Sequence, residues 1–280
     1  MPASMPSPLR PGACLLLFIL LAVGLGACDS SSSTEPPTSP NFLDDEESWT
    51  YETVLTQRPV DSTDVDTTNT AQVRLEVAKT GVELGGRSGL IQVNAFRPSV
   101  PEDIDRSWYQ QSPDSLVDVA YHIDGYSGLT FSREAKSTEL SNLARGLTGL
   151  PLLVRQQLQR RAALQAKAPA DTTVREDSRV VLQAPLEQGA TWTSFRDPFL
   201  NRRTVVGNTT VQTPAGQFDV VEVQATGNFG ESIFQWSDFY SEAGLIKRVF
   251  TDTLERRDDD GTVIGDYIFH EVHTLTDHEE

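Results

Sequence analysis

The chain has 280 residues, and its 23 basic residues against 40 acidic ones give a formal net charge of −17. That length, with 38% hydrophobic residues, is enough for the core of one large domain or two modest ones. Two cysteines exclude a disulfide-rich scaffold. The excess of acid argues against nucleic acid as a partner, because binding phosphate needs a clustered positive surface.

The first 27 residues have the pattern of a secretory signal. Arg10 is the only charged residue before an apolar run, 14–21, that is too short to span a membrane comfortably. The run leads to Leu25-Gly26-Ala27-Cys28, which resembles the lipobox of bacterial lipoproteins. The resemblance implies that residues 1–27 are removed as a signal peptide and that Cys28 carries acyl chains such as palmitate. The alternative is an ordinary signal peptide that is cut after Ala27.

A lipid anchor at Cys28 predicts a protein that is held at the cell envelope. Losing Arg10 takes the net charge from −17 to −18, and losing Cys14 leaves one lipidated cysteine and no intramolecular disulfide. We expect anchoring at the outer membrane or the plasma membrane, facing the periplasm or the exterior. Only 4 of the 23 basic residues are Lys, and this skew together with the acid excess suggests a salt-rich habitat.

Residues 28–48 are rich in Ser, Thr, Pro and acid, and they contain the acidic run 44–47. Such a stretch cannot bury enough apolar surface to order itself. We therefore predict a disordered tether over 28–48, followed by a single antiparallel β domain over 49–280.

From Trp49 onward, apolar and polar side chains mostly alternate, which is the period of a β-strand. Trp49, Tyr51, Thr53 and Leu55 share one face of the first expected strand. Turn residues between most strands predict sequential antiparallel hairpins. The expected strands are 49–55, 73–77, 90–96, 117–123, 179–183, 191–195, 204–213, 218–226, 233–241, 245–254 and 262–275.

The period changes around 137–167, where Leu140, Leu143 and Leu147 are spaced as one face of a helix. Between 145 and 167 there are five basic residues and no acid. This pattern predicts a short helical insertion whose leucine face packs on the sheet. The alternative is a segment that covers an apolar groove or meets anionic head groups.

Short signatures follow one another between residues 185 and 249. They are Pro-Leu-Glu-Gln-Gly-Ala-Thr-Trp from Pro185, Thr-Pro-Ala-Gly-Gln-Phe from Thr213, and Gly-Leu-Ile-Lys-Arg from Gly244. This order resembles a family of uncharacterised bacterial lipoproteins, which is similar to the LolA/LolB-like half-barrel superfamily. The resemblance implies a mainly β fold, a curved antiparallel sheet or half-barrel with the helical insertion on its concave face. It implies no catalytic residue.

The four histidines, His122, His270, His273 and His278, are the first candidates for chemistry. His270 and His273 are three residues apart, so on one strand they point to opposite faces and cannot both bind one metal ion. His122 alternates with apolar residues and is expected to face solvent. We expect no metal site.

Two acidic clusters could suggest calcium, but neither has the spacing of an EF-type loop. Arg256 stands where the first ligand of a loop around Asp258–Gly261 should be, and Asp61, Asp64 and Asp66 lack the central Gly. The chain has no Gly-x-Ser-x-Gly elbow and no phosphate-binding Gly-rich loop. We therefore expect no catalytic residue and no cofactor.

These observations favour a non-catalytic envelope lipoprotein that binds an apolar or lipid ligand between sheet and helices. The alternative is a scaffolding protein that presents its sheet surface to an envelope protein partner. A hydrolase is the third hypothesis, and it would require a pocket that gathers a nucleophile and a base.

Overall fold

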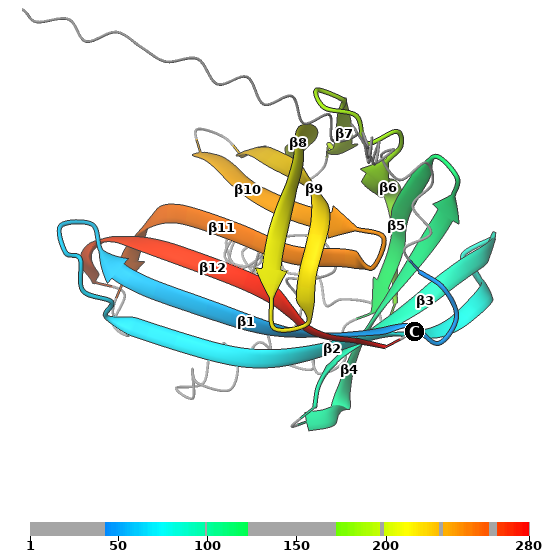
Figure 1. Ribbon diagram of the computed structural model, residues 1–280, viewed down its shortest axis with the longest axis horizontal. Helices are drawn as coiled ribbons and strands as arrows, with labels where there is room; N and C mark the ends of the chain where they lie inside the picture. The colour runs from blue at the N-terminus through cyan, green and yellow to red at the C-terminus, as the bar shows by residue number, and fades with distance from the viewer. Residues whose placement is uncertain are drawn as a thin grey trace, which may run out of the picture. The chain divides into compact units, whose positions relative to one another are not determined.

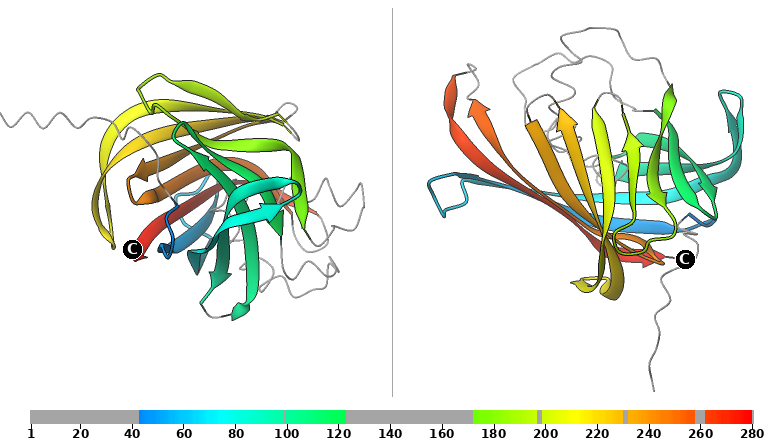
Figure 2. Two further views of the ribbon diagram at one scale, coloured as in Figure 1. Left: turned by 90° about the vertical axis from the view of Figure 1, so that its right-hand side faces the viewer. Right: turned by 90° about the horizontal axis from the view of Figure 1, so that it is seen from above.

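The computed structural model describes residues 43–98, 100–122, 172–196, 199–229, 232–257 and 262–279. All of them belong to one compact unit, Glu35–Glu280. They form a single twelve-stranded antiparallel sheet that is strongly curved (Figures 1 and 2). Among these residues, none forms a helix long and apolar enough to cross a membrane. Cys28 and the helical insertion expected around 137–167 lie outside the described residues.

The strands follow one another along the whole chain. Their bounds are β1 Ser48–Pro59, β2 Thr67–Leu84, β3 Arg87–Arg97, β4 Val100–Ser112, β5 Ser115–His122, β6 Thr173–Gln183, β7 Thr191–Phe195, β8 Leu200–Thr213, β9 Gly216–Phe229, β10 Ser232–Ser241, β11 Gly244–Arg257 and β12 Val263–Glu279. Each strand pairs with its chain neighbours, except that β6 and β7 are the two edges and β1 pairs with β12 in the middle. The chain thus starts at the centre of the sheet, runs out to one edge, crosses to the other and returns.

Side chains join the two edges where no backbone ladder between β6 and β7 is described. The Trp192 indole and the Ser194 hydroxyl, both on β7, donate hydrogen bonds to the Val180 carbonyl on β6, at 3.3 and 2.8 Å. The Val180 carbonyl, at the edge of the sheet, is therefore bonded and is not available to pair with another strand. The sheet is therefore strongly curved but not closed.

The structure confirms the prediction of one mainly antiparallel β sheet and differs from the expected elements in two strands. Strand β4 was not predicted, because Val100-Pro101-Glu102-Asp103 has no apolar alternation, and this first part of the strand forms by pairing with β3. On β5 the apolar residues that alternate with His122, among them Val119, were expected to face the core, and this was wrong. Leu116 joins the inner core, whereas Val119 packs in a separate cluster on the other side.

Two apolar clusters lie on the inner face of the sheet. The larger one, here called the cavity-side cluster, contains a buried residue from each of the twelve strands. The second, the aromatic cluster, consists of Leu55, Phe195, Phe199, Ala225, Phe234, Trp236, Phe250 and Phe269. Phe195 and Phe199 meet edge to face, with ring centroids 4.9 Å apart. Together the two clusters form the core that the alternating strands predict.

A third, smaller cluster lies outside the main core, where the long β2–β3 hairpin curves back over the neighbouring strands. It contains Leu90, Trp108, Val119 and Ala120. Gly85 at the hairpin tip has a φ of +59°, and a Cβ there would lie 3.0 Å from Val174 on β6. Both the positive φ and this close approach therefore favour glycine at the tip.

Candidate functional site

A line of polar and charged side chains separates the two inner clusters. Thr53, Asp238, Arg248 and His273 stand directly opposite one another across β1, β12, β11 and β10. Arg203 on β8 and Glu271 on β12 belong to the next row of the same face. All six are at most 2% exposed. We call these residues the buried polar cluster.

Asp238 is the centre of the buried polar cluster. Arg248 grips it with two bonds, Nε to Oδ1 at 2.5 Å and Nη2 to Oδ2 at 3.1 Å. Arg203 Nη1 donates to the same Oδ2 at 3.1 Å, and the Trp236 indole donates to it at 3.3 Å. The Tyr240 hydroxyl also donates to it, at 3.4 Å. Both carboxylate oxygens are therefore bonded, as a buried charge requires.

Electrostatics keeps these groups charged despite their burial. Burial alone would raise the pKa of Asp238, but the two neighbouring guanidinium groups outweigh it and hold that pKa below its usual value. Burial opposes the charge of Arg248, yet the Asp238 carboxylate raises the pKa of Arg248, and Glu271 adds to the effect. Burial, followed by the charge of Asp238, raises the pKa of the Tyr240 hydroxyl.

The other end of the buried polar cluster is a chain of three side chains. His273 Nε2 lies 2.5 Å from Glu271 Oε1, and its Nδ1 lies 2.8 Å from Thr53 Oγ1. With Glu271 as a carboxylate, Nε2 carries the proton and Nδ1 accepts the Thr53 hydroxyl. The order hydroxyl, imidazole, carboxylate is that of a nucleophile with its base and orienting acid. All three side chains are fully buried, however, so the hydroxyl faces no solvent.

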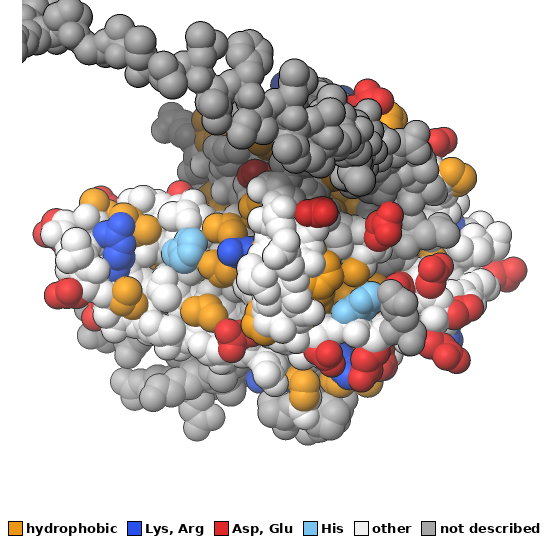
Figure 3. Space-filling model, viewed as in Figure 1, with side chains coloured by type: hydrophobic (Ala, Val, Ile, Leu, Met, Phe, Trp, Pro, Cys, Tyr) orange, Lys and Arg blue, Asp and Glu red, His pale blue; other side chains and the backbone are white. Residues whose placement is uncertain are grey.

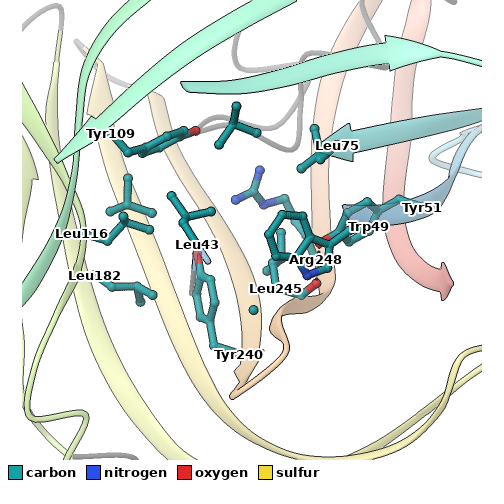
Figure 4. A pocket seen from close by; sticks show the side chains of 13 residues that line it. Leu43, Trp49, Tyr51, Leu75, Tyr109, Leu116, Leu182, Tyr240, Leu245 and Arg248 are labelled. Atoms are coloured by element: carbon teal, nitrogen blue, oxygen red, sulfur yellow. Dashed lines mark hydrogen bonds between the residues drawn. The ribbon is translucent and has the colours of Figure 1, made fainter. Parts of the chain in front are cut away.

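A small cavity opens on the cavity-side cluster, next to the buried polar cluster (Figure 4). Its volume is about 80 Å³. Its walls are mainly aliphatic and aromatic, and Arg248 and Tyr240 belong both to the cavity wall and to the polar contacts around Asp238. The lining residues are Leu43, Trp49, Tyr51, Leu75, Val93, Tyr109, Leu116, Val181, Leu182, Tyr240, Gly244, Leu245 and Arg248.

Hydrogen bonds fix two of the aromatic walls. The Trp49 indole donates to the Ala243 carbonyl and the Tyr51 hydroxyl to the Leu245 carbonyl, each at 2.8 Å. Gly244 lies under the indole with a φ of +90°, and a Cβ there would come 3.4 Å from Trp49 Nε1. Only glycine combines this backbone conformation with such a close ring.

One lining residue, Leu43, comes from outside the sheet. It belongs to Leu43–Glu47, here called the N-terminal strap, which precedes β1. The Glu47 carboxylate accepts the Asp44 N–H at 2.8 Å, and the Glu47 carbonyl accepts the Val77 N–H of β2 at 2.9 Å. Leu43, inside the predicted tether over 28–48, therefore packs on the core.

The structure places the histidines in different surroundings. His273 is buried between Glu271 and Thr53, whereas His270 lies on the outer face, 2.8 Å from Thr251 Oγ1, so their opposite orientation is confirmed. His122 is half-buried rather than solvent-facing, and Thr172 Oγ1 lies 3.3 Å from its Nδ1. His278 stacks on Trp49, with ring centroids 5.8 Å apart.

Among the described acidic candidates, Asp66 is the one for which the structure shows an ion pair. Asp66 pairs with Arg256, and the Asp64 N–H bonds to the Ser62 hydroxyl. In the part of the chain that the structure describes, no three His, Cys, Asp or Glu side chains gather as they would around a metal ion. Asp258–Gly261 lies outside the described residues.

The buried polar cluster was not predicted, although the sequence contains a pattern that indicates it. Asp238 alternates with Trp236 and Tyr240, and Arg248 stands between Ile246 and Phe250 at the same spacing. A charged side chain in phase with the apolar face of a strand must be buried, and a buried charge needs a partner. The signature from Gly244 thus contains Arg248, which is one of the buried charges.

Comparisons with known proteins identify no family for this chain. No protein-family model matches the chain, and no curated protein matches it. A solved candidate exported protein with a YmcC-like fold from Bacteroides fragilis is 11% identical, with a TM-score of 0.40 over 85% of this chain and 97% of that one. A solved candidate lipoprotein from Parabacteroides distasonis is 12% identical, with a TM-score of 0.38 over 86% and 99%. Similarities of this size establish neither a shared fold nor a shared function.

Proposed function

We propose that this chain is a lipid-anchored protein of the cell envelope, held at the outer or plasma membrane through Cys28, that binds the end of an aliphatic chain in its inner cavity. The observation that carries the ligand class is the cavity wall, which is built mainly of Leu, Val, Trp and Tyr side chains. Apolar clefts with few polar groups are the usual sites for such ligands. The family resemblance and the envelope location remain part of this proposal.

The size of the cavity limits the ligand. At about 80 Å³ it is roughly half of the 150 Å³ that holds a benzene molecule in an engineered apolar cavity. A whole phospholipid does not fit, whereas the end of one narrow chain can enter, more so if a lining residue moves. Arg248 already makes two bonds to Asp238, so the aliphatic wall and not a head group is expected to provide the affinity.

Octan-1-ol, an uncharged aliphatic chain, tests this proposal. The chain from residue 28 onward, with Cys28→Ala, retains the whole compact unit and can be titrated without detergent. Leu75→Phe narrows the cavity and should weaken binding about tenfold, because overpacking removes the space for the ligand. Leu254→Phe, on the aromatic cluster, is the matched control and should bind as the wild type does. Equal weakening by both variants, or no binding in any variant, contradicts the proposal.

We propose further that the module is not catalytic. The Thr53 hydroxyl, which contacts His273, is fully buried. This burial favours a structural role for Thr53 over a catalytic one. Hydrolysis of p-nitrophenyl butyrate by the wild type should equal hydrolysis by Thr53→Val and by buffer alone. Hydrolysis that Thr53→Val abolishes would support the hydrolase instead.

The outer face supports a second candidate, a docking surface for an envelope protein. One row across β2, β1, β12, β11 and β10 is Thr70, Val54, Val272, Val249 and Ser237, with no charged side chain. Figure 3 shows this side of the sheet, where uncharged side chains cover much of the surface. In so acidic a protein an uncharged row favours contact with another protein. Val272→Glu should abolish a crosslink in intact cells that Glu52→Ala preserves.

A further inference from the structure

Leu43 occupies the centre of the site that the proposed ligand would need. Its side chain lines the cavity and packs against the buried cavity-side cluster. Figure 4 shows it among the aromatic and aliphatic walls, between Tyr109 and Tyr240. The other twelve lining residues all belong to strands, whereas Leu43 does not. Leu43 therefore contributes a side chain to the cavity without belonging to the sheet.

A tight turn presents Leu43 to the cavity. The Glu47 N–H donates to the Asp44 carbonyl at 3.5 Å, while the Glu47 side chain accepts the Asp44 N–H at 2.8 Å. Glu46 stands at the turn with a φ of +72°, a conformation that disfavours any residue with a Cβ. Both of these bonds are internal to the strap, whereas the bond from the Val77 N–H to the Glu47 carbonyl joins it to β2, and the φ of Glu46 disfavours the turn.

The charge on Glu47 also limits how firmly the strap is held. Its carboxylate is largely buried, and burial raises the pKa of Glu47 despite the hydrogen bond from the Asp44 N–H. His278 Nε2 lies 3.6 Å from Glu47 Oε1 and lowers the pKa of Glu47, but by less than burial raises it. The turn therefore depends on a carboxylate whose ionised form is disfavoured by its own surroundings.

From this geometry we propose that Leu43 is an intramolecular occupant of the cavity, and that an aliphatic ligand must displace it to bind. This rests on the proposed ligand-binding function and names how that site is regulated. The apparent affinity for the ligand is then proportional to the fraction of molecules whose cavity is open. Leu43 lies within the predicted tether over 28–48, so the residue that lines the cavity belongs to the segment that is expected to connect the domain to its lipid anchor.

Three variants of the Cys28→Ala chain separate displacement from a mere change of cavity size. Leu43→Ala removes the occupant and should tighten octan-1-ol binding about tenfold. Glu47→Ala leaves all lining side chains in place but removes the bond to Asp44, and should tighten binding about threefold. Glu46→Gly relieves the positive φ, closes the strap more often and should weaken binding about threefold. Leu254→Ala, a partly buried leucine of the aromatic cluster, is the control with unchanged affinity.

The outcomes distinguish the two proposals. Tighter binding by Leu43→Ala and Glu47→Ala with weaker binding by Glu46→Gly supports the strap. Tighter binding by Leu43→Ala alone shows a wall residue that limits space, and it overturns the strap while the binding function stands. Equal affinity in all variants also overturns the strap alone. No binding in any variant, Leu43→Ala included, overturns the binding function and the strap together.

Discussion

The two ends of the inner face are completed in different ways. The aromatic cluster is packed with rings from β7, β10, β11 and β12 and with Phe199, which directly precedes β8 and meets Phe195 and Phe234 edge to face. The cavity-side cluster instead retains a void of about 80 Å³ and takes one of its side chains from the N-terminal strap. The same alternation of residues thus forms two different ends on one face of the sheet. One is well packed, and the other, here called the unfinished end, contains a cavity.

The buried polar cluster marks the boundary between the two ends. A buried ion pair contributes little to net stability compared with a well-packed apolar alternative, but breaking one is expensive. The buried polar cluster instead matters for the shape of the cavity. Because Arg248 borders the cavity and bonds to Asp238 with two atoms, the polar cluster fixes one wall of the unfinished end.

The largest expected effect is the loss of Asp238. Asp238→Ala leaves two buried guanidinium groups without the carboxylate that they share and should lower the free energy of unfolding by about 3–5 kcal/mol. Arg203→Met, Asp238→Leu and Arg248→Met together should cost less than Asp238→Ala alone, because no unpaired charge remains. Urea unfolding measures both. A triple variant less stable than Asp238→Ala would show that the charges do more than compensate one another.

A pair of leucine truncations compares the two ends directly. Leu55→Ala, in the aromatic cluster, should cost about 3 kcal/mol, whereas Leu75→Ala, in the cavity wall, should cost about 2 kcal/mol. The reason is that Leu75 already faces a void on one side and so has fewer contacts to lose. Equal costs in urea unfolding would mean that the cavity is closed in solution.

Two carboxylates should respond to pH in opposite directions. Asp238 has a lowered pKa, so it stabilises the fold above its unfolded value of about 3.8, and this contribution is lost as the pH falls through the folded value. Glu47 has a raised pKa, so its ionised form costs stability above about 4.5, and protonation relieves that cost as the pH falls from 7. Stability of Glu47→Gln between pH 7 and 4.5 should lack this gain.

The smallest effect should come from salt, and it should not distinguish the two ends. A net charge of −17, or −18 without the signal, repels itself, and molar salt screens that repulsion. The unfolding midpoint of the wild type should rise with potassium chloride, as should those of Leu55→Ala and Leu75→Ala. A midpoint that falls would contradict the salt-rich habitat.

The sequence predicts the strands well where one face is apolar, and less well elsewhere. Trp49, Tyr51 and Leu55 alternate clearly, and the structure buries all three. Strand β4 has no such alternation in its first half, which depends on pairing with β3, and a local sequence pattern does not contain that partner. On β5 both faces are buried, so the period of two could not indicate which one faces the core.

The candidate site was less predictable than the fold, since it depends on register. Arg203, Asp238 and Arg248 come from three strands, and they meet only because the ladders bring their rows together. A charge at an apolar position could have indicated burial for each, but not its partner. Leu43 carried no signal at all, because it lies in a segment whose composition predicts a tether.

The most direct test of ligand binding is a methyl NMR titration of the Cys28→Ala chain with octan-1-ol. The methyl groups of Leu43, Leu75, Leu116, Leu182 and Leu245 line the cavity and should shift on binding. Leu55 and Leu254, on the aromatic cluster, should not. Shifts spread equally over both clusters, or confined to the aromatic one, would contradict the proposed site.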